Sequence, residues 1–171
     1  MTVAVATDLT AGTWAIDPVH SSINFSVRHL MVSKVRGSFE TFSGAITVAE
    51  DGTPSVSATI DVNSIDTRNE QRDAHVRSAD FFDVEAHPDI TVQVTGLEPS
   101  DDRVRLTAVL TVRGVSKPIE LPVDVQVLDD GALRLSGQCE VRRDDFGVSG
   151  DMLGMVGPTT ILSGELVFTR V

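Results

Sequence analysis

The chain has 171 residues, of which 41% are hydrophobic and 23% charged, and its formal net charge is −11 because 25 Asp and Glu outnumber 14 Lys and Arg. This length and composition suit one domain with a packed core and exclude a disordered acidic tail. The excess of acidic residues excludes a general nucleic-acid or anionic-membrane binder, because neutralising phosphates needs a basic face. A single cysteine, Cys139, excludes a disulfide framework and a cysteine-rich zinc module.

The amino terminus carries no recognisable targeting segment. It lacks a basic stretch, and the apolar run at residues 3–6 is too short for a signal-peptide core. No stretch approaches the ~18 apolar residues that would span a bilayer. We therefore expect a cytoplasmic protein with no transmembrane segment, and a periplasmic or secreted one only if a leader is missing. Residues 1–11 are expected to form a flexible tail ahead of a single domain, 12–171.

Apolar residues alternate with polar ones through most of the chain, which is the period of half-buried β-strands. The alternating positions are Ile23, Phe25 and Val27, then Val56, Ala58, Ile60 and Val62, then Ile90, Val92 and Val94, then Val104, Leu106, Ala108, Leu110 and Val112, then Ile119, Leu121, Val123, Val125 and Val127, then Leu133, Leu135, Gly137, Cys139 and Val141, and finally Leu162, Gly164, Leu166 and Phe168. Between Val35 and Val48 the alternation shifts by one residue, which predicts a bulge or bend around Phe39 and Phe42.

Short turn-forming segments separate these runs and predict antiparallel neighbours. They lie at residues 51–54, 96–99, 114–118 and 129–131. One segment departs from the strand pattern. Thr67 and Glu70 have the spacing of a capping box, and residues 68–79 lack β-branched alternation, so one helix is predicted there.

About eight strands, each with one apolar face, can close into a barrel or pair into a sandwich. The inward positions hold medium aliphatic and small residues, and the chain contains no tyrosine and one tryptophan, Trp14. An eight-stranded barrel lined in this way has room for side chains or for one small ligand. A sandwich core built from the same residues fits the alternation as well.

Ordered motifs also run along nearly the whole chain from Trp14. They are Trp14-Ala15-Ile16-Asp17 with His20-Ser21, Phe25 with His29, Gly37-Ser38-Phe39 with Phe42 and Gly44, Ser64-Ile65-Asp66-Thr67, Arg72-Asp73-Ala74-His75, Arg77-Ser78, Asp80-Phe81-Phe82-Asp83, residues 110–118 and residues 143–147. In these motifs the chain resembles the YceI-like, polyisoprenoid-binding family. The resemblance implies an all-β, lipocalin-like antiparallel up-and-down β-barrel of about eight strands with one α-helix near residues 68–79. It also implies that a long isoprenoid or similar lipid tail lies in the lumen, with its polar end near an opening.

The expected ligand-binding residues combine inward-facing apolar positions with polar side chains near the predicted opening. They are Phe25, Val27, His29, Phe39, Ile60, Arg72, His75, Val92, Leu106, Ala108, Leu110, Leu135, Arg143, Leu166 and Phe168. His29 continues an inward apolar face and is therefore a candidate to bind the head group of the ligand. A buried histidine whose ring hydrogen-bonds a backbone carbonyl is an equally good interpretation.

Two further sets of charged side chains have competing interpretations. Arg143 and Asp145 follow the inward positions of the preceding strand, and an arginine there suits a phosphate or carbonyl. For Asp145 we expect an internal Arg–Asp pair that pins a loop. Arg72 and His75 share one face of the predicted helix, where they can meet an anionic head or belong to a solvated surface.

These features favour non-enzymatic binding, storage or transport of a long-chain isoprenoid-type lipid, either a polyprenyl chain or an isoprenoid quinone. We expect no metal, because the four histidines show no ligand-pair spacing, and no cofactor besides the bound lipid. Cys139 is expected to act as a small hydrophobic residue rather than a nucleophile. The alternatives are a lipocalin-like enzyme acting on a hydrophobic small molecule near His29 and Arg143, an interaction module using a barrel edge or the helix, and a filled core without ligand. The expected partners are a hydrophobic small molecule and a second copy of the chain as a candidate, with no nucleic acid.

Overall fold

Antiparallel strands make up most of the chain, as the alternation predicts. The computed structural model describes residues 11–29, 33–148 and 156–171. Its strands are β1 (Gly12–Ile16), β2 (Ser22–His29), β3 (Ser33–Phe39), β4 (Phe42–Val48), β5 (Pro54–Asp61), β6 (Ile65–Asp66), β7 (Asp89–Ser100), β8 (Arg103–Val112), β9 (Val115–Val127), β10 (Leu133–Arg142) and β11 (Val156–Arg170). The helical segments are α2 (Glu70–Arg77) and three short 3-10 turns, η1 (Pro18–His20), η2 (Val62–Ser64) and η3 (Arg143–Phe146). The predicted tail falls almost entirely outside the described residues.

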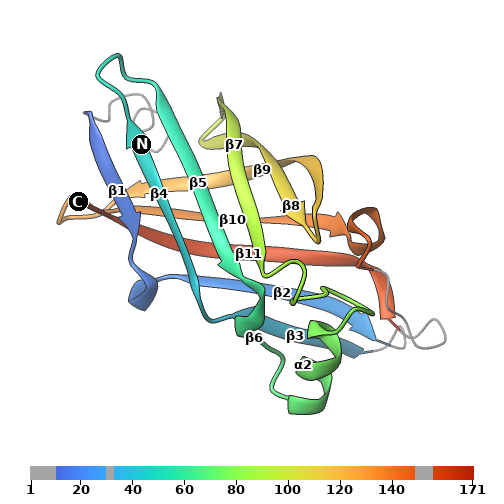
Figure 1. Ribbon diagram of the computed structural model, residues 1–171. Helices are drawn as coiled ribbons and strands as arrows, with labels where there is room; N and C mark the ends of the chain where they lie inside the picture. Colours follow the sequence, from blue (N-terminus) through green and yellow to red (C-terminus); the bar gives the residue numbers. More distant parts are fainter. Residues whose placement is uncertain (1–10, 30–32, 149–155) are drawn as a thin grey trace.

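The sheet closes on itself through pairing between its last and first strands. Eight strands follow one another in the order β1-β4-β5-β7-β8-β9-β10-β11, and β11 pairs back onto β1 from Ile16–Phe168 to Trp14–Arg170. β2, β3 and β6 extend the sheet from the other part of β11 (Figure 1). The closed ring confirms the predicted antiparallel β-barrel and excludes the sandwich, and α2 is the one α-helix within the described residues.

The phase shift near Phe39 and Phe42 corresponds to a bend in a long strand. β3 pairs with β2, whereas β4 pairs with β1, so β3 and β4 run end to end along the bent pair of β1 and β2. The bend between β1 and β2 is η1, where Asp17 accepts a hydrogen bond from the amide of Val19 and lies 2.7 Å from Nδ1 of His20. His20 therefore helps to hold this turn.

Two of the predicted turns were misplaced. β7 runs through residues 96–99 to Ser100, and its pairing with β8 shifts between Val94 and Gly96, so Gly96 marks a bulge. The reversal comes at Asp101, whose φ of 55° lies in the left-handed region. Of residues 114–118, only Gly114 belongs to the chain reversal, because β9 already begins at Val115. Glycine and proline accompany bulges and strand edges as well as turns, and composition alone does not separate these cases.

The helix lies where it was predicted, but its cap differs. Asn69 is the N-cap, and its side chain accepts a hydrogen bond from the amide of Arg72. Thr67 does not cap the helix. It is buried, and its hydroxyl donates a hydrogen bond to the carboxylate of Asp73. The capping box predicted from the spacing of Thr67 and Glu70 was therefore wrong. The threonine side chain hydrogen-bonds a carboxylate inside the fold rather than the backbone at the helix terminus.

One end of the barrel is closed by a packed cluster. Its buried members are Trp14, Ile16, Ile46, Val48, Leu133 and Phe168. The guanidinium of Arg170 lies 4.8 Å from the centre of the Trp14 ring and donates to the carbonyl of Ala11. This cluster seals the end of the barrel where β11 meets β1.

Two inward-facing glycines test the strand packing. A Cβ at Gly44 would lie 2.6 Å from the carbonyl oxygen of Ser57 and 3.0 Å from Cα of Ala58, whereas the nearest described atom to a Cβ at Gly164 is the carbonyl oxygen of Ser22 at 3.8 Å. We expect Gly44→Ala to lower the free energy of unfolding by about 1–3 kcal/mol, because β4 and β5 must separate. Gly164→Ala should raise it by about 0.5–1 kcal/mol, because glycine is costlier to order than alanine.

Urea unfolding of the two variants measures this difference. Equal effects at both positions would contradict the register of β4 against β5.

Candidate functional site

A cavity of about 660 Å³ lies inside the barrel. This volume falls within the range of about 300–1,000 Å³ that is usual for small-molecule sites. Its wall consists mainly of the inward-facing aliphatic side chains of the barrel strands, and its polar lining comes largely from the segment that includes α2.

The wall contains all but one of the residues predicted from the sequence. They are Phe25, Val27, Phe39, Ile60, Arg72, His75, Val92, Leu106, Ala108, Leu110, Leu135, Arg143, Leu166 and Phe168. Six of them are buried, namely Phe39, Ile60, Leu106, Ala108, Leu110 and Phe168. His29 ends β2, but its side chain lies outside the described residues. The structure thus brings the predicted residues to one space, and their contact with a ligand remains a prediction.

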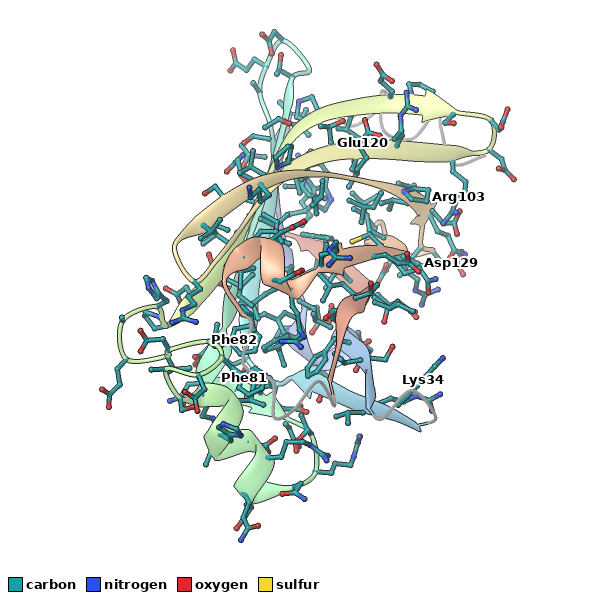
Figure 2. The ribbon with its side chains drawn as sticks, turned by 90° about the vertical axis from the view of Figure 1, so that its right-hand side faces the viewer. Lys34, Phe81, Phe82, Arg103, Glu120 and Asp129 are labelled. Carbon is teal, nitrogen blue, oxygen red and sulfur yellow. The ribbon has the colours of Figure 1, made fainter. Side chains whose placement is uncertain are left out.

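Sequence reasoning missed the residues that cover the α2 end of the cavity. They are Thr67, Asn69, Gln71, Val76, Phe81, Phe82, Phe146 and Val148. Phe82 packs edge-on against Phe39, with ring centres 6.4 Å apart, and Figure 2 shows Phe81 and Phe82 beside α2 at this end of the barrel. The alternation of inward and outward residues that identified the strand positions does not apply to a helix or a loop. The available signal for this end of the cavity was the adjacent pair Phe81-Phe82 in the motif Asp80-Phe81-Phe82-Asp83.

A buried hydrogen-bond network holds α2 against this end. The amide and hydroxyl of Thr67 donate to Oδ1 of Asp73 at 2.8 and 2.5 Å. Nε and Nη2 of Arg72 donate to the hydroxyl and carbonyl oxygens of Thr67 at 2.9 and 2.7 Å. Asp73 and Thr67 are buried. The guanidinium of Arg72 is therefore held in a fixed orientation at the cavity wall.

Phe81 joins the helix side of this end to η3. Its ring meets His75 edge-on with centres 5.1 Å apart, and the guanidinium of Arg143 lies 6.0 Å from its centre. Nε2 of His75 is 3.0 Å from Asp80, and Arg143 donates to the carbonyl of Val148 at 2.8 Å. The expected pairing of Asp145 was wrong. Asp145 is exposed, and the neighbouring ion pair joins Arg142 to Asp144 at 2.9 Å.

The cavity therefore has an apolar body and a polar end that carries two arginines and a histidine. Planar guanidinium groups donate well to phosphate and carbonyl oxygens. Within the described residues no group of three or more His, Cys, Asp or Glu is placed to hold a metal ion. Nor does that part of the chain contain a helix long and apolar enough to cross a membrane.

Cys139 lies on the cavity wall and is half-buried. Burial raises the pKa of its thiol. The thiol is then protonated over a wider pH range than a free one and is a weak nucleophile at neutral pH. This supports the expectation that Cys139 packs rather than reacts.

The rate of Cys139 alkylation should follow this raised pKa. The rate should keep rising with pH beyond ~8.5, the usual pKa of a free thiol, because the thiolate of Cys139 forms at a higher pH in the folded protein. Iodoacetamide labelling of folded and urea-unfolded protein, followed by mass spectrometry, measures both profiles. Superimposed profiles would show that the thiol is not in an apolar wall.

The network under α2 predicts a second effect. Asp73→Ala leaves the buried amide and hydroxyl of Thr67 without their acceptor, so the free energy of unfolding should fall by about 1–3 kcal/mol. Asp80→Ala, which removes an exposed partner of His75, should change it by less than about 1 kcal/mol. Thermal and urea unfolding measure both, and an equal, small effect would argue against the network.

The YceI-like domain family matches residues 14–168. The chain is 33% identical over 140 residues to Protein YceI of Salmonella newport, and 36% identical over 142 residues to a UPF0312 protein of Pectobacterium carotovorum. Each alignment covers 78% of this chain and 73% of the relative.

Solved structures share the barrel. BcnA of Burkholderia cenocepacia superimposes with a TM-score of 0.81 at 22% identity, covering 89% of this chain and 98% of that one. A polyisoprenoid binding domain from Saccharophagus degradans gives 0.78 at 20% identity, covering 92% and 98%. A YceI protein of Campylobacter jejuni gives 0.67 at 26% identity, covering 84% and 89%. By its family match and its curated relatives, the chain belongs to the YceI-like family.

Proposed function

We propose that the protein binds one long-chain isoprenoid-type lipid in the barrel cavity and holds it without chemical change. The observation that carries this proposal is a cavity of about 660 Å³ whose wall is mostly aliphatic and aromatic. The structural neighbour from Saccharophagus degradans is described as a polyisoprenoid binding domain, which supports the same class of ligand. Polyprenyl chains and isoprenoid quinones both belong to this class.

The size of the cavity sets how much of a tail it can hold. At about 30 Å³ per water-sized group, the cavity takes on the order of 20 non-hydrogen atoms, or roughly four five-carbon units. Each unit gains about 4 kcal/mol gross, at ~0.8 kcal/mol per methylene. Four units therefore offset association costs of about 4–15 kcal/mol.

The polar end supplies the orientation. Arg72, Arg143 and His75 line the cavity near α2, whereas the opposite end is sealed by the cluster around Trp14. We infer that the tail points toward this cluster and that a phosphate or carbonyl head lies near the arginines. In this arrangement burial of the tail provides the binding affinity, and the arginines provide selectivity for the head group.

A plug in the lumen tests the proposal. Gly164 lines the cavity, and a Cβ there has only ordinary contacts with the described atoms. Gly164→Leu should therefore place its side chain in the lumen and displace about one five-carbon unit, weakening binding at least about tenfold. Thr91→Leu adds a similar side chain on the exposed face of β7 and should leave binding unchanged.

Native mass spectrometry after incubation with geranylgeranyl phosphate measures occupancy in all three proteins. One bound chain in the wild type and in Thr91→Leu, with little in Gly164→Leu, is the expected result. A wild-type protein that takes up neither this probe nor a short-chain ubiquinone would refute the proposal.

A further inference from the structure

The barrel wall has an unpaired seam between β9 and β10. The two strands pair from Val127–Leu133 to Val123–Gly137. Beyond this point, over residues 115–122 and 138–142, which are all described, β9 pairs with β8 on one side and β10 pairs with β11 on the other. The ribbons of β9 and β10 lie together near the Leu133 end of β10 and diverge toward η3 in both views (Figures 1 and 2).

The sequence explains why the pairing stops. Extending the register would place Pro122 opposite Gln138 and Pro118 opposite Arg142. The ladder with β8 continues past both prolines. Their nitrogens must therefore point away from β8 and toward β10, where a proline has no N–H to donate.

A like-charge pair adds to this effect. The same register would set Glu120 opposite Glu140, and directly opposed like charges destabilise an antiparallel pair. Glu120 is labelled on β9 in Figure 2. The prolines and the carboxylates also discourage a second chain from pairing along this edge.

The seam borders the cavity directly. Ile119 and Leu121 from β9, and Cys139 and Val141 from β10, all line the cavity and are half-buried. The two edges thus face each other with apolar side chains toward the lumen and unpaired backbone groups along the opening.

Contacts among the described residues also cross both ends of the barrel. The Trp14 cluster seals one end. At the other, Nη1 of Arg113 donates to the carbonyls of Phe81 and Gly147 at 3.0 and 2.6 Å, which ties the segment after α2 to the loop after η3. Passage through the seam would break no hydrogen bond of the β9–β10 ladder.

We propose that the seam between β9 and β10 is a side portal through which an apolar chain enters and leaves the cavity. This inference rests on the proposed function, because it concerns the route of the same ligand. The chain slides between Ile119 and Leu121 on one edge and Cys139 and Val141 on the other. Side chains at the portal then control the rates of exchange, whereas other wall residues control affinity.

Two matched valines separate the portal from the rest of the wall. Val141→Ala widens the seam, while Val92→Ala removes the same groups from a wall position paired on both sides, opposite Ala58 and Leu110. Stopped-flow fluorescence with a dansyl-labelled geranylgeranyl amine gives the two rate constants. Val141→Ala should raise both association and dissociation rates about threefold or more, whereas Val92→Ala should change dissociation alone.

A closing variant tests the portal in the opposite direction. Pro122→Thr with Glu140→Lys restores an N–H donor and places a cation opposite Glu120. Both rate constants should fall about tenfold or more, with little change in Kd. Amide hydrogen exchange at residues 138 and 140 shows whether the seam has paired.

The outcomes distinguish the two proposals. A wild-type protein that binds no probe refutes the proposed function and the portal together. Binding with the same kinetic response in Val141→Ala and Val92→Ala refutes the portal alone. Protected amides in the closing variant with unchanged rates would also refute it, and if those amides stay unprotected the valine pair decides.

Discussion

The pairing of β11 with β1 is the constraint on which the rest of the structure depends. It joins Trp14 to Arg170 and Ile16 to Phe168, and so converts an open sheet into a ring. Once the ring is closed, every inward-facing residue points at the same space. Those positions include small residues such as Ala108, Gly137 and Gly164, so the wall does not fill the lumen with its own side chains, and an apolar cavity remains.

The cavity is polarised because its two ends are built differently. Trp14, Leu133 and Phe168 pack into a buried apolar cluster at one end. At the other, the buried pair of Thr67 and Asp73 fixes α2 and thereby Arg72 at the wall. A buried polar network of this kind is stable only when its groups are paired, so it also fixes where the helix can sit. An amphipathic ligand would meet an apolar floor and a cationic rim.

Local alternation was enough to predict the strands and the inward face, since period two follows directly from strand geometry. It was not enough to choose a barrel over a sandwich, because the deciding contact joins residues about 150 positions apart. The bulge at Gly96 and the buried role of Thr67 were missed for a related reason. Glycine serves bulges and turns alike, and a threonine before a helix bonds whichever acceptor the fold brings near it.

The candidate site shows the same division. Strand positions such as Phe25, Val92 and Leu135 line the cavity as the alternation of the strands predicted, whereas Phe81 and Phe82 come from a segment without a regular alternation.

A crystal structure of the protein grown with a polyprenyl phosphate tests the central claim most directly. Continuous density for the chain between the two ends, with the phosphate near Arg72 and Arg143, is the predicted result. A lumen filled by the protein's own side chains, with no density for the chain, would contradict it.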